Sequence, residues 1–127
     1  MRLPWIALGL AIAVTPAGAQ EVKRAILQRV DVPTAAAHET VIGTVEVPAG
    51  GATGRHTHFG VEMLIMLEGE MDVFIDGEAP KHLKAGDSLA IPTGKVHDAR
   101  TVSSEAAKAA VTWVVEKGKP MATPAAK

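Results

Sequence analysis

The sequence of 127 residues contains no cysteine, which excludes disulfide bonds, thiol nucleophiles and cysteine-ligated zinc sites. It also contains no tyrosine, and aromatic residues make up only 3% of the chain, too few for a base-stacking platform. Neither sign of charge is in excess, because 13 basic residues face 14 acidic ones and neither kind forms a run. These absences argue against binding to nucleic acid or to an anionic membrane surface.

A long hydrophobic run is absent too, although a short one lies near the N-terminus. After Arg2, residues 5–14 are uninterruptedly apolar, and this is well short of the roughly 20 residues that a membrane-spanning helix needs. Thr15-Pro16 ends the run, and Ala17-Gly18-Ala19 follows as a small-residue cleavage site. This order predicts a cleavable signal peptide over residues 1–19 and a periplasmic or secreted protein without membrane attachment after cleavage.

The rest of the chain predicts one all-β domain over residues 20–116. Hydrophobic residues make up 47% of the chain and charged residues 21%, an ordinary globular balance in a length that suits a single domain. Short alternating or β-branched runs recur between Gly, Pro and Asp turns, which is typical of a sandwich or barrel. We expect strands at residues 22–30, 41–47, 61–67, 71–75, 88–91, 96–102 and 110–116.

Two segments do not fit the strand pattern. Residues 103–110 are alanine-rich and predict either a helix or an irregular loop. Residues 117–127 contain Pro120 and Pro124 and predict a flexible C-terminal tail. No internal repeat is present, so we expect one barrel rather than a duplicated pair.

The alternation of side chains in the strand at residues 61–67 places a carboxylate in a buried position. Glu62, Leu64 and Met66 share one face of the strand, and the odd-numbered residues of the segment share the other. Both faces are apolar, so we expect this strand to be buried on both sides. Because an unpaired buried charge is costly, Glu62 then needs a cation or a proton.

Three histidines can supply the other ligands of such a cation. His56 and His58 are two residues apart, so both imidazoles project the same way from an extended segment, and His97 can join them through strand pairing. With Glu62 they form a donor set that suits one divalent transition metal: Fe, Mn, Ni, Cu or Zn. A six-coordinate ion would keep two open positions, as catalytic sites do. On spacing alone, however, an H-x-H pair in a glycine-rich stretch is also typical of a surface loop.

The spacing of the residues around these histidines carries more information. From Gly50 to Gly69 the chain reads G-x5-H-x-H-x3-E-x6-G, and from Gly86 to His97 it reads G-x5-P-x-G-x2-H. The two strings resemble the paired signature motifs of the cupin superfamily, over residues 50–69 and 86–101. Every signature glycine, proline and ligand is in place. One departure is Thr101, which stands where the second motif usually ends in asparagine.

The resemblance implies a single jelly-roll β-barrel, commonly a homodimer, with the metal inside its mouth. Small exported cupins of this kind are similar to the quercetin-dioxygenase-like (cupin-2) group. The likeness implies a metal-dependent dioxygenase for a small enolic or phenolic substrate, in which Glu62 is a metal ligand and a general base. A non-catalytic protein that binds a metal or a small ligand is the alternative. Cupin lyases and isomerases often use a tyrosine base, and this sequence has none.

Other residues have weaker signals. His38 and His82 lie outside both motifs, and we expect both to be exposed to solvent. Two inward residues that follow Glu62 are candidate pocket residues or plain core, and two aromatic residues and the motif threonine are further candidates. The candidate pocket residues are Phe59, Leu64, Met66, Thr101 and Trp113.

Overall fold

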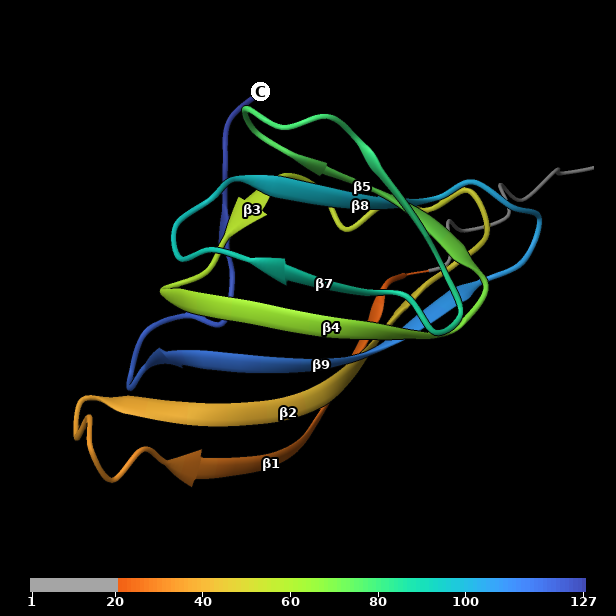
Figure 1. The fold of residues 1–127 in the computed structure, drawn as a ribbon. Coiled ribbons are helices and arrows are strands. Elements are labelled where there is room, and N and C mark those ends of the chain that lie inside the picture. The colour runs from red at the N-terminus through yellow and green to blue at the C-terminus, as the bar shows by residue number, and fades with distance from the viewer. Residues whose placement is uncertain (1–20) are drawn as a thin grey trace, which may run out of the picture.

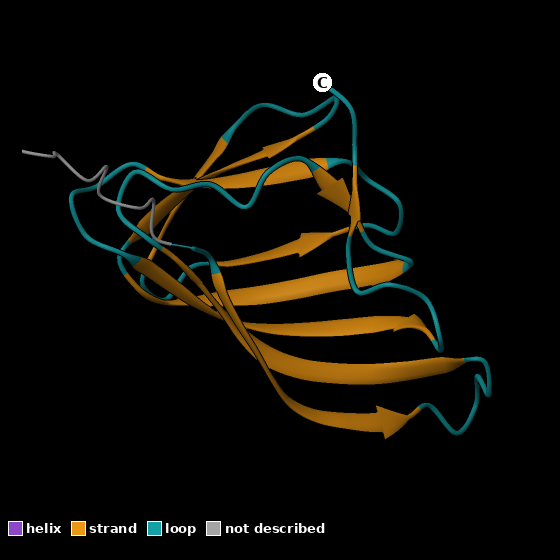
Figure 2. Ribbon diagram, turned by 180° about the vertical axis from the view of Figure 1, so that it is seen from behind, coloured by secondary structure: helices purple, strands orange, loops and turns teal. Residues whose placement is uncertain are grey.

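The computed structural model describes residues 21–127, and the signal peptide expected over residues 1–19 lies outside that range. The described residues contain no helix, and so none that could cross a membrane. Two five-stranded antiparallel sheets face one another, which confirms the expected all-β sandwich (Figures 1 and 2). The strands are β1 (Lys23–Asp31), β2 (His38–Val47), β3 (His56–Thr57), β4 (Gly60–Glu68), β5 (Glu70–Ile75), β6 (Lys81–Lys84), β7 (Ser88–Ile91), β8 (His97–Thr101), β9 (Ala107–Glu116) and β10 (Thr123–Pro124).

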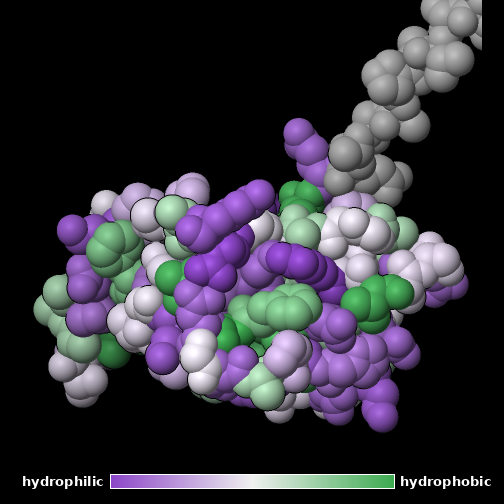
Figure 3. All heavy atoms as spheres, turned by 90° about the horizontal axis from the view of Figure 1, so that it is seen from above, coloured by the Kyte–Doolittle hydropathy of each residue, from purple (hydrophilic) through white to green (hydrophobic). Residues whose placement is uncertain are grey.

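The larger sheet has the order β1-β2-β9-β4-β7 and the smaller one the order β10-β3-β8-β5-β6. Their inward side chains form one hydrophobic core, in which Met66 and Val111 of the larger sheet pack with Met71 and Val73 of the smaller one. Burying a side chain of this size stabilises the fold by about 1.5–3 kcal/mol. Seen from the side of the smaller sheet, the surface is predominantly hydrophilic with scattered hydrophobic side chains (Figure 3).

The alanine-rich segment at residues 103–110 is not helical, and β9 begins within it. Ala107 and Ala109 are buried, whereas Lys108 and Ala110 are only half-buried, so the segment alternates as a strand does. The high helix propensity of alanine is outweighed here by pairing on both sides, with β2 and with β4.

Strand β4 is covered on one face only, in contrast to the expectation from its composition. The inward residue Met66 is 1% exposed, whereas Met63, Ile65 and Leu67 on the outward face are 45–46% exposed. The second sheet lies on the inward side alone, so the outward residues have no layer above them within residues 21–127. Two apolar faces therefore do not mean two buried faces in this strand.

The segment after residue 116, expected to be a flexible tail, forms a strand instead. Thr123 and Pro124 make up β10, which pairs with Thr57 and His56 of β3. The Ala125 amide continues the pairing by donating to the Arg55 carbonyl at 2.9 Å. The C-terminal segment thus becomes the edge of the smaller sheet, beside the two histidines of the first motif.

Candidate metal centre

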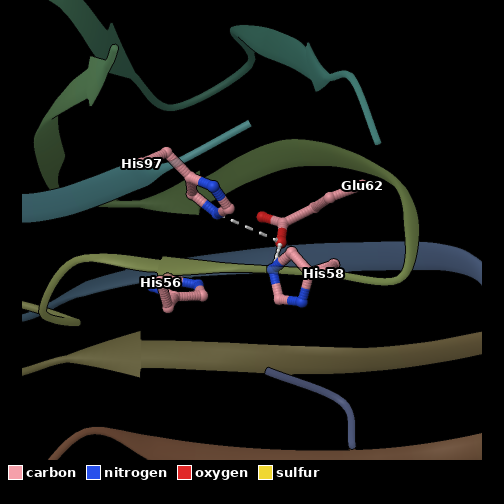
Figure 4. Close-up of side chains that lie close together, drawn as sticks. All are labelled: His56, His58, Glu62 and His97. Carbon is pink, nitrogen blue, oxygen red and sulfur yellow. Dashed lines mark ion pairs between the residues drawn. The ribbon is translucent and has the colours of Figure 1, made fainter. Parts of the chain in front are cut away.

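His56, His58, Glu62 and His97 come together in one cluster, as the motif spacing predicts. Each offers one potential ligand atom, and these atoms all lie within 4.8 Å of one another. Figure 4 shows the three imidazoles and the carboxylate converging from separate segments of the chain. The four residues could therefore bind a metal ion.

Strand pairing explains how distant residues meet. His56 of β3 is the direct partner of His97 of β8, so both imidazoles project from the same face with ring centroids 4.2 Å apart. The two motifs are also joined by a backbone bond, because the Gly94 amide donates to the His58 carbonyl at 3.2 Å. Gly94 has a φ of +73°, which favours glycine at this turn before His97.

Strand β4, which carries Glu62, approaches β9 very closely at Gly60. A Cβ at Gly60 would lie 1.8 Å from the Val114 carbonyl oxygen, so any other residue would push β4 away from β9. Two residues further on, Glu62 lies opposite Trp113 of β9 in the same register. Gly60 thus sets the distance at which the carboxylate and the indole meet.

Each of the three imidazoles has its Nδ1 atom bound to a backbone carbonyl. His56 Nδ1 lies 2.7 Å from the Gly54 oxygen, and His97 Nδ1 lies 2.9 Å from the Lys95 oxygen. The His58 Nδ1 atom contacts the Met121 oxygen in the same way. Since a carbonyl can only accept, each Nδ1 must carry the hydrogen, and in a neutral ring the lone pair is then at Nε2.

The Nε2 atoms of His58 and His97 face the carboxylate of Glu62. The Nε2 atoms of His58 and His97 are buried, and neither has a hydrogen-bond partner among the described residues. They lie 2.5 Å and 3.7 Å from Glu62 Oε2, as the dashed lines in Figure 4 mark. Lone pairs of neutral rings that point at a carboxylate repel it unless a proton or a metal cation lies between them. The donor set and its orientation therefore fit a bound divalent metal.

The ionisation of the cluster follows the same pattern. Burial works against the charge of Glu62, yet the His58 and His97 imidazoles hold the pKa of its carboxyl far below the usual value. Burial also works against a charged His97, but Glu62 and the Lys95 carbonyl raise the pKa of His97 above its ordinary value. Burial lowers the pKa of His56. The carboxylate is thus ionised at neutral pH, and its negative charge favours the protonated form of His97.

Comparison with known protein families finds a match to the cupin domain over residues 43–115, which is more than half of the chain. The chain belongs to the cupin superfamily. A search of curated proteins finds no match. The family match confirms the sequence-based assignment to this superfamily.

Several solved structures share this cupin fold. A conserved protein of Klebsiella pneumoniae with a double-stranded β-helix domain has a TM-score of 0.67 at 23% identity, over 90% of this chain and 91% of that one. A cupin-like protein of Thermotoga maritima has a TM-score of 0.64 at 22% identity, over 84% and 77%. The DMSP lyase DddQ of Ruegeria pomeroyi has a TM-score of 0.61 at 27% identity, over 67% of this chain but only 42% of the lyase.

The cluster of three histidines and Glu62 opens onto a small cavity of about 40 Å³ in the interior of the sandwich. That space suffices for about three water molecules. Apart from the cluster, its walls are mainly apolar, and they include Leu64 and Trp113. Arg24 of β1 is the one other charged residue of the lining, and it lies outside both sequence motifs.

Three of the candidate pocket residues lie elsewhere. Met66 is two positions beyond Leu64 and packs in the core, and Phe59 is 38% exposed, with the Lys119 ammonium 5.3 Å from its ring centroid. The Thr101 hydroxyl donates to the Pro48 carbonyl at 2.6 Å and accepts from the Gly51 amide at 3.0 Å. In place of the usual asparagine, the threonine thus ties β8 to the loop that leads into β3.

Trp113 does more than line the cavity. Its indole Nε1 donates to Glu62 Oε2 at 2.9 Å, and both side chains are buried. A hydrogen bond to a charged group is among the stronger ones in proteins, so the indole fixes the direction of the carboxylate. The sequence contains no local sign of this bond, because it depends on the register between β4 and β9.

Proposed function

We propose that this cupin binds one divalent transition metal (Fe, Mn, Ni, Cu or Zn) and acts as a metal-dependent dioxygenase on a small enolic or phenolic substrate. The observation that carries the metal-binding part is the orientation of the three imidazoles. Their Nδ1 atoms are all engaged by carbonyls, the Nε2 atoms of His58 and His97 are turned toward the carboxylate of Glu62, and His56 offers a ligand atom to the same cluster. Histidines that ligate metals are typically held in this way.

The metal, when bound, supplies a Lewis acid and open coordination positions for the substrate and O₂. His56, His58 and His97 would hold it through Nε2, and Glu62 through a carboxylate oxygen. The low pKa of Glu62 favours the ligand role, because a strongly stabilised carboxylate is a weak base. Its role as the group that takes the substrate proton therefore requires that it first leave the metal.

The surroundings of the cluster favour a small anionic substrate. The cavity has room for only a few atoms, so a large aromatic substrate would have to remain at the mouth. There, Arg24, Arg55 and His56 line a groove of about 350 Å³ together with the C-terminal segment. No ion-pair partner of Arg24 is found within residues 21–127, whereas Arg55 is bound to Asp76 at 2.7 Å. An enolate or phenolate would meet the Arg24 guanidinium on its way to the metal.

Oxygen uptake by protein loaded in turn with each of the five metals tests the dioxygenase. Acireductone and small diketones are suitable substrates, with a flavonol as the large comparison. We expect uptake with at least one metal and its loss in Glu62→Gln. The matched control is Glu68→Gln, which makes the same change at an exposed position of the same strand. No uptake with any metal and substrate would contradict the oxygenase.

Non-catalytic binding of a metal or a small ligand is the second candidate, and the small cavity with few polar groups favours it. Under this alternative, the metal raises the thermal midpoint but no substrate is turned over. A lyase activity is suggested by the likeness to the DMSP lyase of Ruegeria pomeroyi. The absence of tyrosine from the sequence counts against it, since cupin lyases often rely on that residue as the base.

We also propose that the protein is exported and acts as a homodimer. The apolar run and small-residue site before Gln20 support export, and N-terminal sequencing of the mature protein should begin at Gln20. The exposed apolar residues on the outward face of the larger sheet support association. Met63 and Ile42 lie in one row across β4, β9 and β2, because both are in register with Thr112.

A further inference from the structure

The three histidines of the cluster differ in what holds them. The carbonyls that bind the Nδ1 atoms of His56 and His97 belong to Gly54 and Lys95, each two residues earlier in the chain. The carbonyl that binds His58 Nδ1 belongs to Met121, which is 63 residues away in the C-terminal segment. Two ligands are therefore oriented by their own loops, and one depends on a distant part of the chain.

The C-terminal segment is attached firmly enough to serve this role. Thr123 and Pro124 pair with β3, and the Ala125 amide donates to the Arg55 carbonyl at 2.9 Å. The Arg55 Nε–H group donates a hydrogen bond to the Ala126 carbonyl at 3.1 Å. Met121 itself packs against the hydrophobic core. The carbonyl that faces His58 is thus held by the packing of its own residue and by the pairing of the residues that follow.

We propose that residues 120–124 are a positioning element of the metal centre, which holds the His58 ring with its Nε2 atom toward the metal. This inference rests on the proposed metal binding. Without the Met121 carbonyl, the His58 ring can rotate or take the other tautomer, and a correctly directed ligand is lost although all four ligand residues remain. Loss of such an outer partner typically lowers metal affinity by about 10–100-fold.

Three variants separate the carbonyl from the rest of the segment. Deletion of residues 120–127 removes the carbonyl together with β10. Deletion of residues 125–127 removes the contacts with Arg55 but keeps Met121 and β10. Met121→Ala removes the packing of the side chain but keeps the backbone carbonyl. We expect the dissociation constant for Zn²⁺, measured by chelator competition, to rise about 10–100-fold in the first variant and by much less in the other two, because each of these keeps the remaining contacts that hold the carbonyl.

Imidazole ¹⁵N resonances of the Zn²⁺-loaded proteins provide a readout that a general loss of stability would not move. In the full chain we expect all three histidines to carry the proton on Nδ1. In the deletion of residues 120–127, only His58 should change the nitrogen that carries its proton, because His56 and His97 keep their local carbonyls. The spectrum of the full chain needs no variant, so the proposal can be checked even if the deletion does not fold. A proton on Nε2 of His58 in the full chain would overturn it.

The other outcomes are equally decisive. Equal Zn²⁺ affinity of the full chain and of the deletion of residues 120–127 would refute the positioning role while leaving the proposed metal site intact. An equal loss in Met121→Ala would assign the effect to packing rather than to the carbonyl. If all three histidines changed their protonated nitrogen together, the segment would be needed only to keep β3 in place, and the specific role of the Met121 carbonyl would be refuted. No Zn²⁺ binding by the full chain would instead refute the proposed function, and this inference with it.

Discussion

The two faces of β4 are alike in hydrophobicity but differ in surroundings. The inward face carries Glu62 and Met66, which are 7% and 1% exposed and lie between the sheets. The outward face carries Met63, Ile65 and Leu67, which are 45–46% exposed. Composition alone does not distinguish the faces, and the one carboxylate on the inward side is what reveals the site. Chemistry and stability should therefore depend on the inward face, and association on the outward one.

The largest difference in stability is expected between two methionines of this strand. Met66→Ala would leave a cavity in the core and should lower the free energy of unfolding by about 2–5 kcal/mol. Met63→Ala makes the same change on the outward face and should alter it by no more than about 0.5 kcal/mol. Urea unfolding of both variants in dilute solution measures the two effects. Similar losses would mean that the outward face is covered even in the isolated chain.

On the inward face, the bond between Trp113 and Glu62 can be removed while an aromatic ring is kept. Trp113→Phe should weaken metal binding by about 10–100-fold, because the carboxylate loses the donor that fixes its direction. Ile91→Val is the matched control, since Ile91 lies opposite Glu62 on β7 and makes only packing contacts there. Chelator competition should show normal affinity in the control. Normal affinity in Trp113→Phe would show that the indole is only a wall of the cavity.

The pH dependence of metal binding follows from the charges on the same face. Glu62 raises the pKa of His97, so in the metal-free protein a proton is held there to a higher pH than on an ordinary imidazole. The metal must displace this proton, and its apparent affinity should fall about tenfold per pH unit below that pKa and level off above it. Glu62→Gln should shift the fall to lower pH, besides weakening binding. An apparent affinity that does not change between pH 5 and 8 would contradict this.

The smallest effect on folding is expected from the outward face. Ile65→Lys should change the free energy of unfolding of the monomer by no more than about 0.5 kcal/mol but abolish dimerisation, because it places a charge in an apolar surface. Val102→Lys, at an exposed apolar position that follows β8, should leave the dimer intact. Analytical ultracentrifugation distinguishes the two. A dimer that survives Ile65→Lys would place the interface elsewhere.

The fold and the ligands were predictable because they depend on local patterns. Alternation along β4 places Glu62 inward, and the spacing of the two motifs brings His97 to the other ligands. The start of β9 was not predictable in this way, because Ala107 and Ala109 favour a helix until neighbouring strands bury them. The exposure of Met63 was also missed, since composition does not tell which layers a fold provides.

The groups that hold the ligand side chains in place cannot be predicted from local sequence patterns. The bond from Trp113 to Glu62 depends on the register of two strands that are far apart in sequence. The carbonyl of Met121 acts through the backbone, so no side chain in the C-terminal segment signals its role. The prolines of that segment suggested a flexible tail, whereas Pro124 lies at the edge of a sheet, where a missing amide hydrogen is tolerated.

Elemental analysis of the protein purified from its native compartment tests the metal centre most directly. We expect about one transition-metal ion per chain, and its loss in His97→Ala. His82→Ala is the matched control, because His82 is exposed and lies outside the cluster, and it should retain the metal. A native protein without any transition metal, or a His97→Ala variant that retains a full equivalent, would contradict the assignment of these four residues as a metal site.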